Sequence, residues 1–457
     1  MRVPEGARTV IGALKKAGYE AYLVGGCVRD ALLSVSAEDV EPHDWDICTN
    51  ARPDEMKAVF AGGRTIGTGL RHGTLTVLMP DGPYEVTAYR IDGTYSDGRR
   101  PDSVTFTAEL TEDLARRDFT INAMAMGVDG EGNTAEVIDP FGGREDLARR
   151  VLRCVGEANV RFEEDALRIL RALRFASRLG LAIDPATCSA MLEKRALLRR
   201  ISAERTMDEL GKTLLTERGW AYFLEYRDIL TEIVPELAPC VGFEQRNPWH
   251  CYDVFEHSLR SVGYAPPDLT LRMTMLLHDV GKPAAASVDE TGVGHFYGHA
   301  EVSAAMAEKI LTRLHCSHQL TRDVTELIRF HDAEAAPSAR TLRRLLNKLG
   351  PWQLQRLLRV KRADTLAQSE LHREERLHEL DESEALLARI LTARQAFSLQ
   401  DLAINGEDLI AHGVVPGPAL GARLQRALDA VLDGTAENDR DTLLQIALET
   451  QKTDEPM

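Results

Sequence analysis

A glycine pair near the start of the chain has the sequence context of a phosphate-binding turn. Gly25 and Gly26 stand between a short apolar run, residues 22–24, that predicts a strand and a helical pattern over residues 27–33. Glycines let backbone N–H groups approach a phosphate, and the N-terminus of the following helix adds positive dipole. Arg29 then offers a planar, permanently charged fork for phosphate oxygens. The pattern therefore predicts a phosphate site at this turn.

Two carboxylates follow shortly downstream, and they predict a divalent cation. Asp44 and Asp46 have a spacing that, on a strand, places both side chains on one face. Carboxylates held side by side repel each other unless a cation lies between them, and Mg²⁺ takes oxygen ligands together with nucleotide phosphates. A glycine turn or an acidic pair alone is a common surface feature. In this order and this close, they indicate a phosphate and a metal on neighbouring strands.

A predicted β-hairpin supplies a candidate third carboxylate. Alternating runs over residues 72–79 and 84–90 are separated by the turn-forming sequence P-D-G-P. Glu85 and Thr87 share one face of the second strand. Glu85 is therefore either a third catalytic carboxylate beside the acidic pair or an ordinary exposed strand residue.

Two motifs in this part of the chain resemble a known family. The sequence G-G-x-V-R-D-x-L-L followed by D-x-D resembles the first motif of the nucleotidyltransferases of the poly(A) polymerase and CCA-adding type. The sequence R-R-D-F-T-I-N-A, residues 116–123, is similar to the second motif of the class II, bacterial-type tRNA nucleotidyltransferases. That resemblance implies that Arg117 binds the phosphates of the nucleotide and Asp118 its ribose hydroxyl. Asn122, among apolar residues, is either a structural bracket or a ligand contact, because a buried Asn needs partners.

The segment between these motifs predicts a mobile loop. Residues 91–103 are rich in Gly, Asp and Arg and lack periodicity. The segment is either an ordinary surface loop or, with Arg99 and Arg100 directly after the site strands, a lid over a nucleotide. In CCA-adding enzymes a loop at this place is implicated in the final adenosine step, so its presence here favours the full reaction over CC addition.

A long amphipathic pattern over residues 161–180 predicts a helix with a buried stripe. Glu164, Arg168 and Arg171 lie on another face. Asp165 and Arg168 are neighbours at helical spacing, which permits a salt bridge on a solvated face. An Asp and an Arg can also hydrogen-bond the Watson–Crick edge of cytosine or adenine while mismatching uracil and guanine. The buried stripe comprises Ala166, Ile169, Leu170, Leu173 and Ala176.

The same helix carries a motif of the family. E-D-x-x-R resembles the amino-acid template motif of class II CCA-adding enzymes. The resemblance implies that Glu164, Asp165 and Arg168 select the incoming nucleotide. Arg171 is a further nucleotide-binding candidate, and Arg205, in a stretch that matches the neck of the family, is another contact that the resemblance suggests.

A second constellation lies in the middle of the chain. Neutral imidazoles and carboxylates in helical surroundings suit one or two divalent metals, which lower the pKa of bound water and assist phosphoester hydrolysis. The series resembles the HD phosphohydrolase superfamily. The resemblance implies that His257, His278, Asp279 and Asp364 are the core metal ligands, and His299 and His331 are candidates for a second metal. The alternative is a purely structural body, and His295 has no place in the pattern. The series consists of His257, His278, Asp279, His299, His331 and Asp364.

Composition bounds the class of protein. At about 150 residues per domain, the 457 residues predict about three domains, and 44% hydrophobic and 28% charged residues are typical of a soluble globular protein. A net charge of −16 argues against a uniformly basic surface but allows a local basic groove. The 7 cysteines include no C-x-x-C pair, which predicts reduced thiols in a cytoplasmic protein. No signal peptide is expected, and no apolar stretch approaches the roughly 18 residues of a membrane span.

The expected fold class is α+β. A nucleotidyltransferase head with a mixed β-sheet and helices would occupy residues 1–142, followed by a helical neck at 143–215, a helical HD body at 216–390 and a helical tail at 391–457. The tail has the pattern of a helix, a Gly-rich turn and a second helix. This pattern either presents N–H groups to a phosphate or forms a plain helical hairpin. It is similar to the tRNA-binding tail of Gram-positive-type class II enzymes.

The resemblance implies an enzyme that adds CMP, CMP and AMP to the 3′ end of tRNA from CTP and ATP. Asp44 and Asp46 would hold two Mg²⁺ ions, and a divalent transition metal would occupy the HD site. Alternatives with the same chemistry are a CC-adding enzyme, an A-adding enzyme and a poly(A) polymerase. An alternative of another class is a metal-dependent HD phosphohydrolase with a degenerate head. The sequence leaves the oligomeric state open.

Overall fold

The computed structural model describes residues 2–34, 44–93 and 103–449. The chain forms two compact units, residues 1–235 and 236–457. The boundary lies inside the predicted body, so the division into four parts stays a prediction. Arg99 and Arg100 of the predicted lid lie outside the described residues.

The first unit is built on a mixed seven-stranded sheet with the strand order β3-β4-β5-β2-β1-β8-β9. Strands β2 and β5 are parallel, and the other neighbouring pairs are antiparallel. This confirms the predicted α+β head and its hairpin, β4–β5. The strands are β1 (Ala21–Val24), β2 (Ile47–Thr49), β3 (Thr65–Ile66), β4 (Thr74–Met79), β5 (Gly82–Ala88), β8 (Ala125–Val128) and β9 (Thr134–Ile138).

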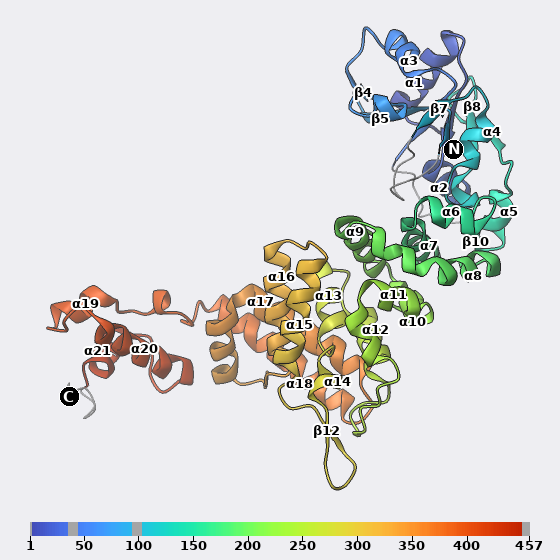
Figure 1. The fold of residues 1–457 in the computed structure, drawn as a ribbon. Coiled ribbons are helices and arrows are strands. Elements are labelled where there is room, and N and C mark those ends of the chain that lie inside the picture. The colour runs from blue at the N-terminus through green and yellow to red at the C-terminus, as the bar shows by residue number, and fades with distance from the viewer. Residues whose placement is uncertain (1, 35–43, 94–102, 450–457) are drawn as a thin grey trace. The chain divides into compact units, whose positions relative to one another are not determined.

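Short helices surround the sheet, and α1 and α3 lie beside the β4–β5 hairpin (Figure 1). Strands β6 (Arg90–Asp92) and β7 (Val104–Phe106) pair with each other, so the prediction of a structureless segment from residue 91 to 103 is wrong at its start. The two strands bring the ends of that segment together. The helices of the head are α1 (Glu5–Lys16), α2 (Gly26–Ser34), α3 (Pro53–Val59), α4 (Leu110–Ala115), η2 (Thr120–Asn122) and α5 (Gly143–Ala148).

Helices dominate the rest of the first unit, and the apolar stripe of α7 is buried as predicted. The single helix predicted over residues 161–180 is wrong, because the chain breaks at Asp165. Asp165 is extended, with φ −144°, and its Oδ1 accepts the N–H of Leu167 at 3.0 Å, which replaces a helical hydrogen bond. The elements are β10 (Val151–Leu152), α6 (Ala158–Glu164), α7 (Leu167–Leu179), β11 (Ala182–Ile183), α8 (Pro185–Lys194), η3 (Arg195–Arg200), α9 (Ala203–Leu214), α10 (Gly219–Glu225) and α11 (Arg227–Ile233).

The described part of the second unit is helical apart from a small hairpin, β12 (Ser287–Val288) with β13 (Gly294–His295), which was not predicted from the sequence. Helices α12, α13, α15, α16 and α17 pack against one another (Figure 1). Helix α17 kinks at Gly350, whose φ of 73° is outside the helical region. The helices are η4 (Pro235–Cys240), α12 (Val254–Tyr264), α13 (Leu269–Leu277), α14 (Lys282–Ala285), α15 (His299–Arg313), α16 (His318–Phe330), α17 (Ala339–Ala367) and α18 (Arg373–Thr392).

The tail has its own small hydrophobic core. Ala427 and Val431 are buried in it, and Leu420 and Leu424 pack against it. The predicted helix, turn and helix are confirmed by α19 and α20, and a further helix, α21, follows. Among the described residues, none of the helices combines the length and the apolar character that crossing a bilayer requires. The tail elements are η5 (Leu399–Asp401), α19 (Gly406–Ala411), α20 (Pro418–Asp433) and α21 (Arg440–Leu448).

Candidate active site and a second cluster of metal ligands

The predicted phosphate-binding turn has the expected form of strand, glycine and helix. Strand β1 ends at Val24, Gly25 has a φ of +80°, and α2 begins at Gly26. A Cβ atom on Gly25 would lie 3.1 Å from Nη1 of Arg117, so the guanidinium lies directly over the turn. The Nε of Arg117 is buried and has no hydrogen-bond acceptor in the described structure. The turn and a cation with a spare donor therefore face the same space.

Asp44 and Asp46 lie immediately before β2 rather than on it, which corrects the predicted position on a strand. The chain is nevertheless held against β1 there, because the carbonyl of Asp46 accepts the N–H of Val24 at 3.0 Å. In the parallel pairing of β2 with β5, Ile47 is level with Val86, so the preceding residues Asp46 and Glu85 are level as well. Asp44, Asp46 and Glu85 line one cavity of about 580 Å³.

The three carboxylates repel one another. The pKa of Asp46 is raised to about 6, first by loss of surrounding water and then by the negative charge of Glu85, while Arg117 acts in the opposite direction. A cation between these oxygen atoms would relieve the repulsion, and an all-carboxylate donor set suits Mg²⁺. The residues present therefore fit the predicted metal.

Arg29 lies in a different environment from the one its sequence predicted. It is 3% exposed, its Nε donates to Asp30 at 2.8 Å and its Nη1 donates to Oδ1 of Asn122 at 2.7 Å. Asn122 in turn donates to Oδ1 of Asp118 at 3.2 Å. Asn122 thus has protein partners on both sides, which favours the bracket over the ligand contact. Arg29 therefore holds Asn122 in place, and Arg117 is the cation that lies next to the Gly25 turn.

Asp118 is held by an arginine of the neck. Arg171 donates to Oδ2 of Asp118 through Nε at 2.9 Å and through Nη2 at 2.6 Å, so two charged donors converge on one carboxylate oxygen. Burial raises the pKa of Asp118, but the charge and hydrogen bonds of Arg171 outweigh burial and hold the pKa below its usual value. The guanidinium of Arg171 also stacks on Phe175, 5.1 Å from the ring centre. The predicted ribose contact is therefore an ionised, oriented carboxylate.

The predicted base-selecting residues have separate partners. Oδ2 of Asp165 accepts from Nη2 of Arg205 at 2.7 Å, which brings the neck arginine suggested by the sequence to this site. Arg168, 8% exposed, donates to Oε2 of Glu164 at 2.5 Å and to the carbonyl of Arg116 at 3.0 Å. Because the helix breaks at Asp165, spacing within one helix no longer defines how these side chains meet.

Replacing Gly25 with Ala is expected to destabilise the protein by about 1–3 kcal/mol and to weaken nucleotide binding, since a side chain at φ +80° is strained and would push against Arg117. Gly12 of α1 is a matched control, because a Cβ there meets nothing within 4 Å and Ala is the better helix former by about 1 kcal/mol. Urea unfolding should move in opposite directions for the two variants. Equal shifts would contradict a special role for the Gly25 turn.

The predicted His and Asp series converges at one place in the second unit. His257 comes from α12, His299 begins α15, and Asp364 comes from α17, while His278 and His331 directly follow α13 and α16. The Nδ1 atom of each imidazole faces a backbone carbonyl. The pairs are His257 with Ala367 at 3.4 Å, His278 with Met275 at 2.8 Å, His299 with Phe296 at 2.8 Å and His331 with Ile328 at 2.6 Å. A carbonyl only accepts, so Nδ1 carries a proton, and in the neutral imidazole Nε2 then presents a lone pair.

The lone pairs face each other in two sets. The Nε2 atoms of His257 and His278 are 3.3 Å apart, and those of His299 and His331 are 3.2 Å apart. Two lone pairs cannot bond to each other, and a cation between the two nitrogens of each pair would satisfy both. Asp279 lies between the pairs: its Oδ2 is 3.2 Å from His278 and its Oδ1 is 3.3 Å from His299. The two sets of side chains could therefore hold two metal ions that share Asp279.

Charge supports the same interpretation. Burial lowers the pKa of a histidine, but Asp279 and Asp364 outweigh burial and raise the pKa of His278 to about 10, so the carboxylates favour a positive charge at this place, which a bound divalent metal would supply instead of a proton. Oδ1 of Asp279 and Oδ1 of Asp364 are buried without a hydrogen-bond donor in the described structure, although Asp364 is 2.9 Å from Nε2 of His257. The mixed nitrogen and oxygen donors fit divalent transition metals.

Sequence reasoning missed three residues of this cluster. Asp332 has one carboxylate oxygen 3.3 Å from His299 and the other 3.4 Å from His331, which completes the second position. Lys282 lies 2.7 Å from Asp279 and 3.3 Å from Nε2 of His250. The adjacent His-Asp pair at 331–332 repeats the pair at 278–279 and could have revealed Asp332. His295 is bonded to Asp289 in the hairpin and lies outside the cluster.

Three family models match successive parts of the chain. The model of the "Poly A polymerase head domain" matches residues 21–153, the model described as "Probable RNA and SrmB- binding site of polymerase A" matches residues 180–241, and the model of tRNA nucleotidyltransferase domain 2 matches residues 294–447.

Relatives match over nearly the whole chain. The CCA-adding enzyme of Limosilactobacillus reuteri is 35% identical over 459 residues, which cover 98% of this chain and 97% of the relative. The CCA-adding enzyme of Levilactobacillus brevis is 37% identical over 449 residues, with 96% of each chain covered. The crystal structure of the Bacillus stearothermophilus CCA-adding enzyme in complex with CTP is 30% identical, has a TM-score of 0.69 and matches 97% of this chain and 96% of its own. The Thermotoga maritima CCA-adding enzyme complexed with tRNA shares the fold at 20% identity, with a TM-score of 0.59, over 98% of this chain and 96% of its own.

Proposed function

The chain belongs to the CCA-adding tRNA nucleotidyltransferases, and from this premise we propose that it adds two cytidylates and one adenylate to the 3′ end of tRNA, using CTP and ATP. The observation that carries the proposal is the cavity in which Asp44, Asp46 and Glu85 converge next to the Gly25 turn. Carboxylates beside a phosphate-binding turn are the arrangement that nucleotidyl transfer needs.

The residues divide the work of the reaction among them. The Gly25–Gly26 turn, with the backbone N–H of Gly26 at the start of α2, holds the triphosphate together with Arg117, and Asp118 accepts a hydrogen bond from the ribose hydroxyl. Asp44 and Asp46 hold Mg²⁺, and Glu85 contributes a third carboxylate. Bound Mg²⁺ supplies neutralisation of the phosphate charge. The 3′ oxygen of the tRNA forms a bond to the α-phosphorus, and the bond to pyrophosphate breaks.

Tests on shortened tRNAs distinguish the candidate reactions. The substrates end at the discriminator base, at C and at CC, and each receives CTP, ATP or both. We expect CTP alone to complete CC, ATP alone to extend only the CC end, and both together to complete CCA. A CC-adding enzyme would leave the CC end unextended, an A-adding enzyme would leave the shortest tRNA unextended, and a poly(A) polymerase would continue past the first A.

Base selection is assigned to Asp165 with Arg168. Both are engaged by protein partners in the structure, Asp165 by Arg205 and Arg168 by Glu164, so nucleotide binding has to exchange these partners for the base edge. Replacing Asp165 with Ala is expected to lower the preference for CMP over UMP roughly tenfold or more, because one base-edge contact is worth about 1–3 kcal/mol.

Competition between CTP and UTP on a tRNA ending at the discriminator base measures this preference. The matched control is Glu163→Ala, an exposed acidic residue of α6 that pairs with Lys194. An Asp165→Ala enzyme with an unchanged CTP preference would exclude this residue from base selection.

A second candidate function is favoured by the cluster around Asp279. We propose that it binds two divalent metals and hydrolyses a phosphoester. The supporting observation is that four imidazoles and three carboxylates form two ligand sets in which the Nε2 atoms of two histidines face each other. Bound metals would lower the pKa of a water molecule and neutralise the charge of the phosphate. In the reaction, a water oxygen bonds to phosphorus and the ester oxygen leaves with a proton.

A further inference from the structure

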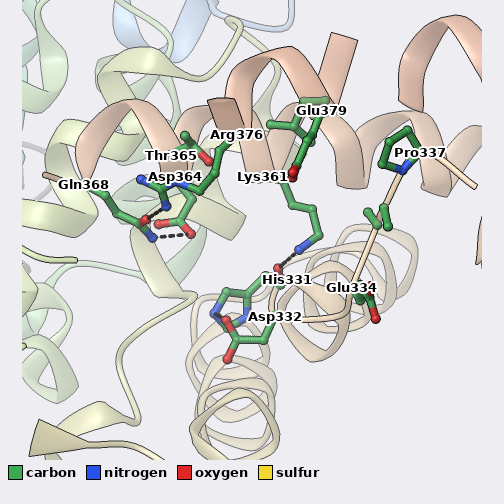
Figure 2. Close-up of a pocket in the computed structure, with 13 residues that line it drawn as sticks. His331, Asp332, Glu334, Pro337, Lys361, Asp364, Thr365, Gln368, Arg376 and Glu379 are labelled. Carbon is green, nitrogen blue, oxygen red and sulfur yellow. Dashed lines mark hydrogen bonds and ion pairs between the residues drawn. The ribbon is translucent and has the colours of Figure 1, made fainter. Parts of the chain in front are cut away.

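A cavity of about 370 Å³ opens against the metal-ligand cluster (Figure 2). The end of α16 contributes His331 and Asp332, α17 contributes Asp364, and α18 forms the opposite wall. Two candidate metal ligands of separate positions, Asp332 and Asp364, thus lie on the wall of one cavity. Any molecule held there would be in reach of the reaction centre.

Two cations line this cavity, and neither is paired with a carboxylate among the residues that the structure describes. The ammonium of Lys361 donates to the carbonyl of His331 at 2.8 Å (Figure 2). An ammonium group has three donors, so two remain. Arg376 donates to the side-chain oxygen of Gln368 and to the carbonyl of Leu371 at 3.3 Å, and its Nε is buried without an acceptor. All of these acceptors are neutral oxygens.

Two other basic residues of α17, the helix that carries Lys361, do have acidic partners. Arg362, next to Lys361 in the sequence, lies 2.6 Å from Asp381 and 3.2 Å from Glu384. Arg356 lies 3.2 Å from Asp323. Lys361 thus differs from these two basic residues of α17, whose charges are paired with carboxylates.

The position of Arg376 is fixed by its surroundings. Its guanidinium lies over the ring of Trp249, 5.5 Å from the centre, and Gln368 connects it to the metal-ligand candidate Asp364 through a hydrogen bond of 2.9 Å (Figure 2). Glu334 and Glu379 lie at the exposed rim. A fixed guanidinium with a free donor, beside an ammonium with two, is suited to phosphate oxygens.

We infer that this cavity binds a second, non-scissile phosphate of the substrate, so that the cluster acts on small molecules that carry two phosphate groups. The inference rests on the proposed hydrolytic function of the cluster. Water attacks the phosphorus at the metal ligands, that phosphate leaves as inorganic phosphate, and the alcohol product keeps its second phosphate against Arg376 and Lys361.

Calorimetric binding of alkanediol bisphosphates and alkyl monophosphates, with three to six carbons, tests the inference on the full chain. These probes have no base or ribose, so they avoid the nucleotide contacts of the head. We expect the best bisphosphate to bind roughly tenfold or more tightly than its monophosphate, because a charge-assisted contact to an arginine is worth that much. Replacing Arg376 with Gln should bring the ratio close to one, and Arg376→Lys should restore part of it.

Arg389 of the same helix α18 is the matched control, since it is exposed and far along the helix from the cavity. Arg389→Gln should keep the bisphosphate preference. Circular dichroism and tRNA extension verify that each variant is folded. A wild type with no preference, or an Arg376→Gln variant that keeps it, would overturn the inference.

Metal analysis of the same samples separates the inference from the function it rests on. Wild-type protein that binds metal but shows no bisphosphate preference contradicts the phosphate subsite alone. Wild-type protein without metal that still prefers bisphosphates, with loss in Arg376→Gln, supports the anion subsite and contradicts the hydrolytic function. A variant that loses the preference together with the metal would mean that Arg376 acts only through Gln368 on Asp364, which also overturns the subsite.

Discussion

Replacing Asp44 with Asn is expected to reduce tRNA 3′-end extension roughly a thousandfold or more, because it removes one of the carboxylates that hold Mg²⁺ against the triphosphate. Asp44 is exposed in the cavity that it shares with Asp46 and Glu85, so the stability of the fold should change little. Single-turnover incorporation of CMP, measured over a range of Mg²⁺ concentrations, gives the size of the loss.

Asp54→Asn is the matched control for this experiment, since Asp54 is an exposed acidic residue of α3 in the same unit. It should keep the wild-type rate. Full extension by the Asp44→Asn enzyme would show that the head does not carry the chemistry, which is the alternative of a degenerate head. Loss of extension, with any phosphoester hydrolysis intact, would assign the two activities to separate places in the chain.

Replacing Asp279 with Ala is expected to remove both metals from the cluster. One oxygen of Asp279 faces His278 and the other faces His299, so a single side chain serves both positions. Metal content, measured by mass spectrometry after dialysis against divalent transition metals, should fall from about two ions per chain to nearly none. Asp332 serves only the second position, so Asp332→Ala should lose about one ion.

His295→Ala is the control here, because His295 is bonded to Asp289 outside the cluster. It should leave the metal content unchanged. Extension of tRNA should also persist in Asp279→Ala, since Asp44 and Asp46 belong to the other unit. Wild-type protein that takes up no metal would exclude the metal cluster. A loss of extension in step with unfolding would favour a structural body.

Local features of both sites were predictable from the sequence. The strand, Gly25 and helix follow from apolar periodicity and from the need for glycine at positive φ, and the β4–β5 hairpin follows from alternation around turn residues. The His and Asp series was recognisable because its residue types suit a metal wherever the fold brings them together. These signals lie within a few residues or in side-chain chemistry, so they do not depend on tertiary contacts.

Which side chains pair with each other could not be predicted from the sequence in the same way. Asp165 and Arg168 have the spacing of neighbours on one helix, but a side-chain hydrogen bond breaks the helix, and Asp165 pairs instead with Arg205 on α9. Arg29 looked available for phosphate, yet it is buried against Asn122, far away in the sequence. Such contacts depend on how distant segments pack, and sequence spacing carries information only over about one helical turn.

The sequence by itself therefore determined the class of chemistry: a glycine turn with carboxylates for nucleotidyl transfer, and imidazoles with carboxylates for a metal cluster. Only the tertiary structure decided which groups act together. It placed Glu85 level with Asp46 at the start of the β2–β5 pairing, put Asp279 between two histidine pairs, and left Lys361 and Arg376 without an ion pair among the described residues. The physical reason is that charges and lone pairs act over a few ångströms in space, whatever their separation along the chain.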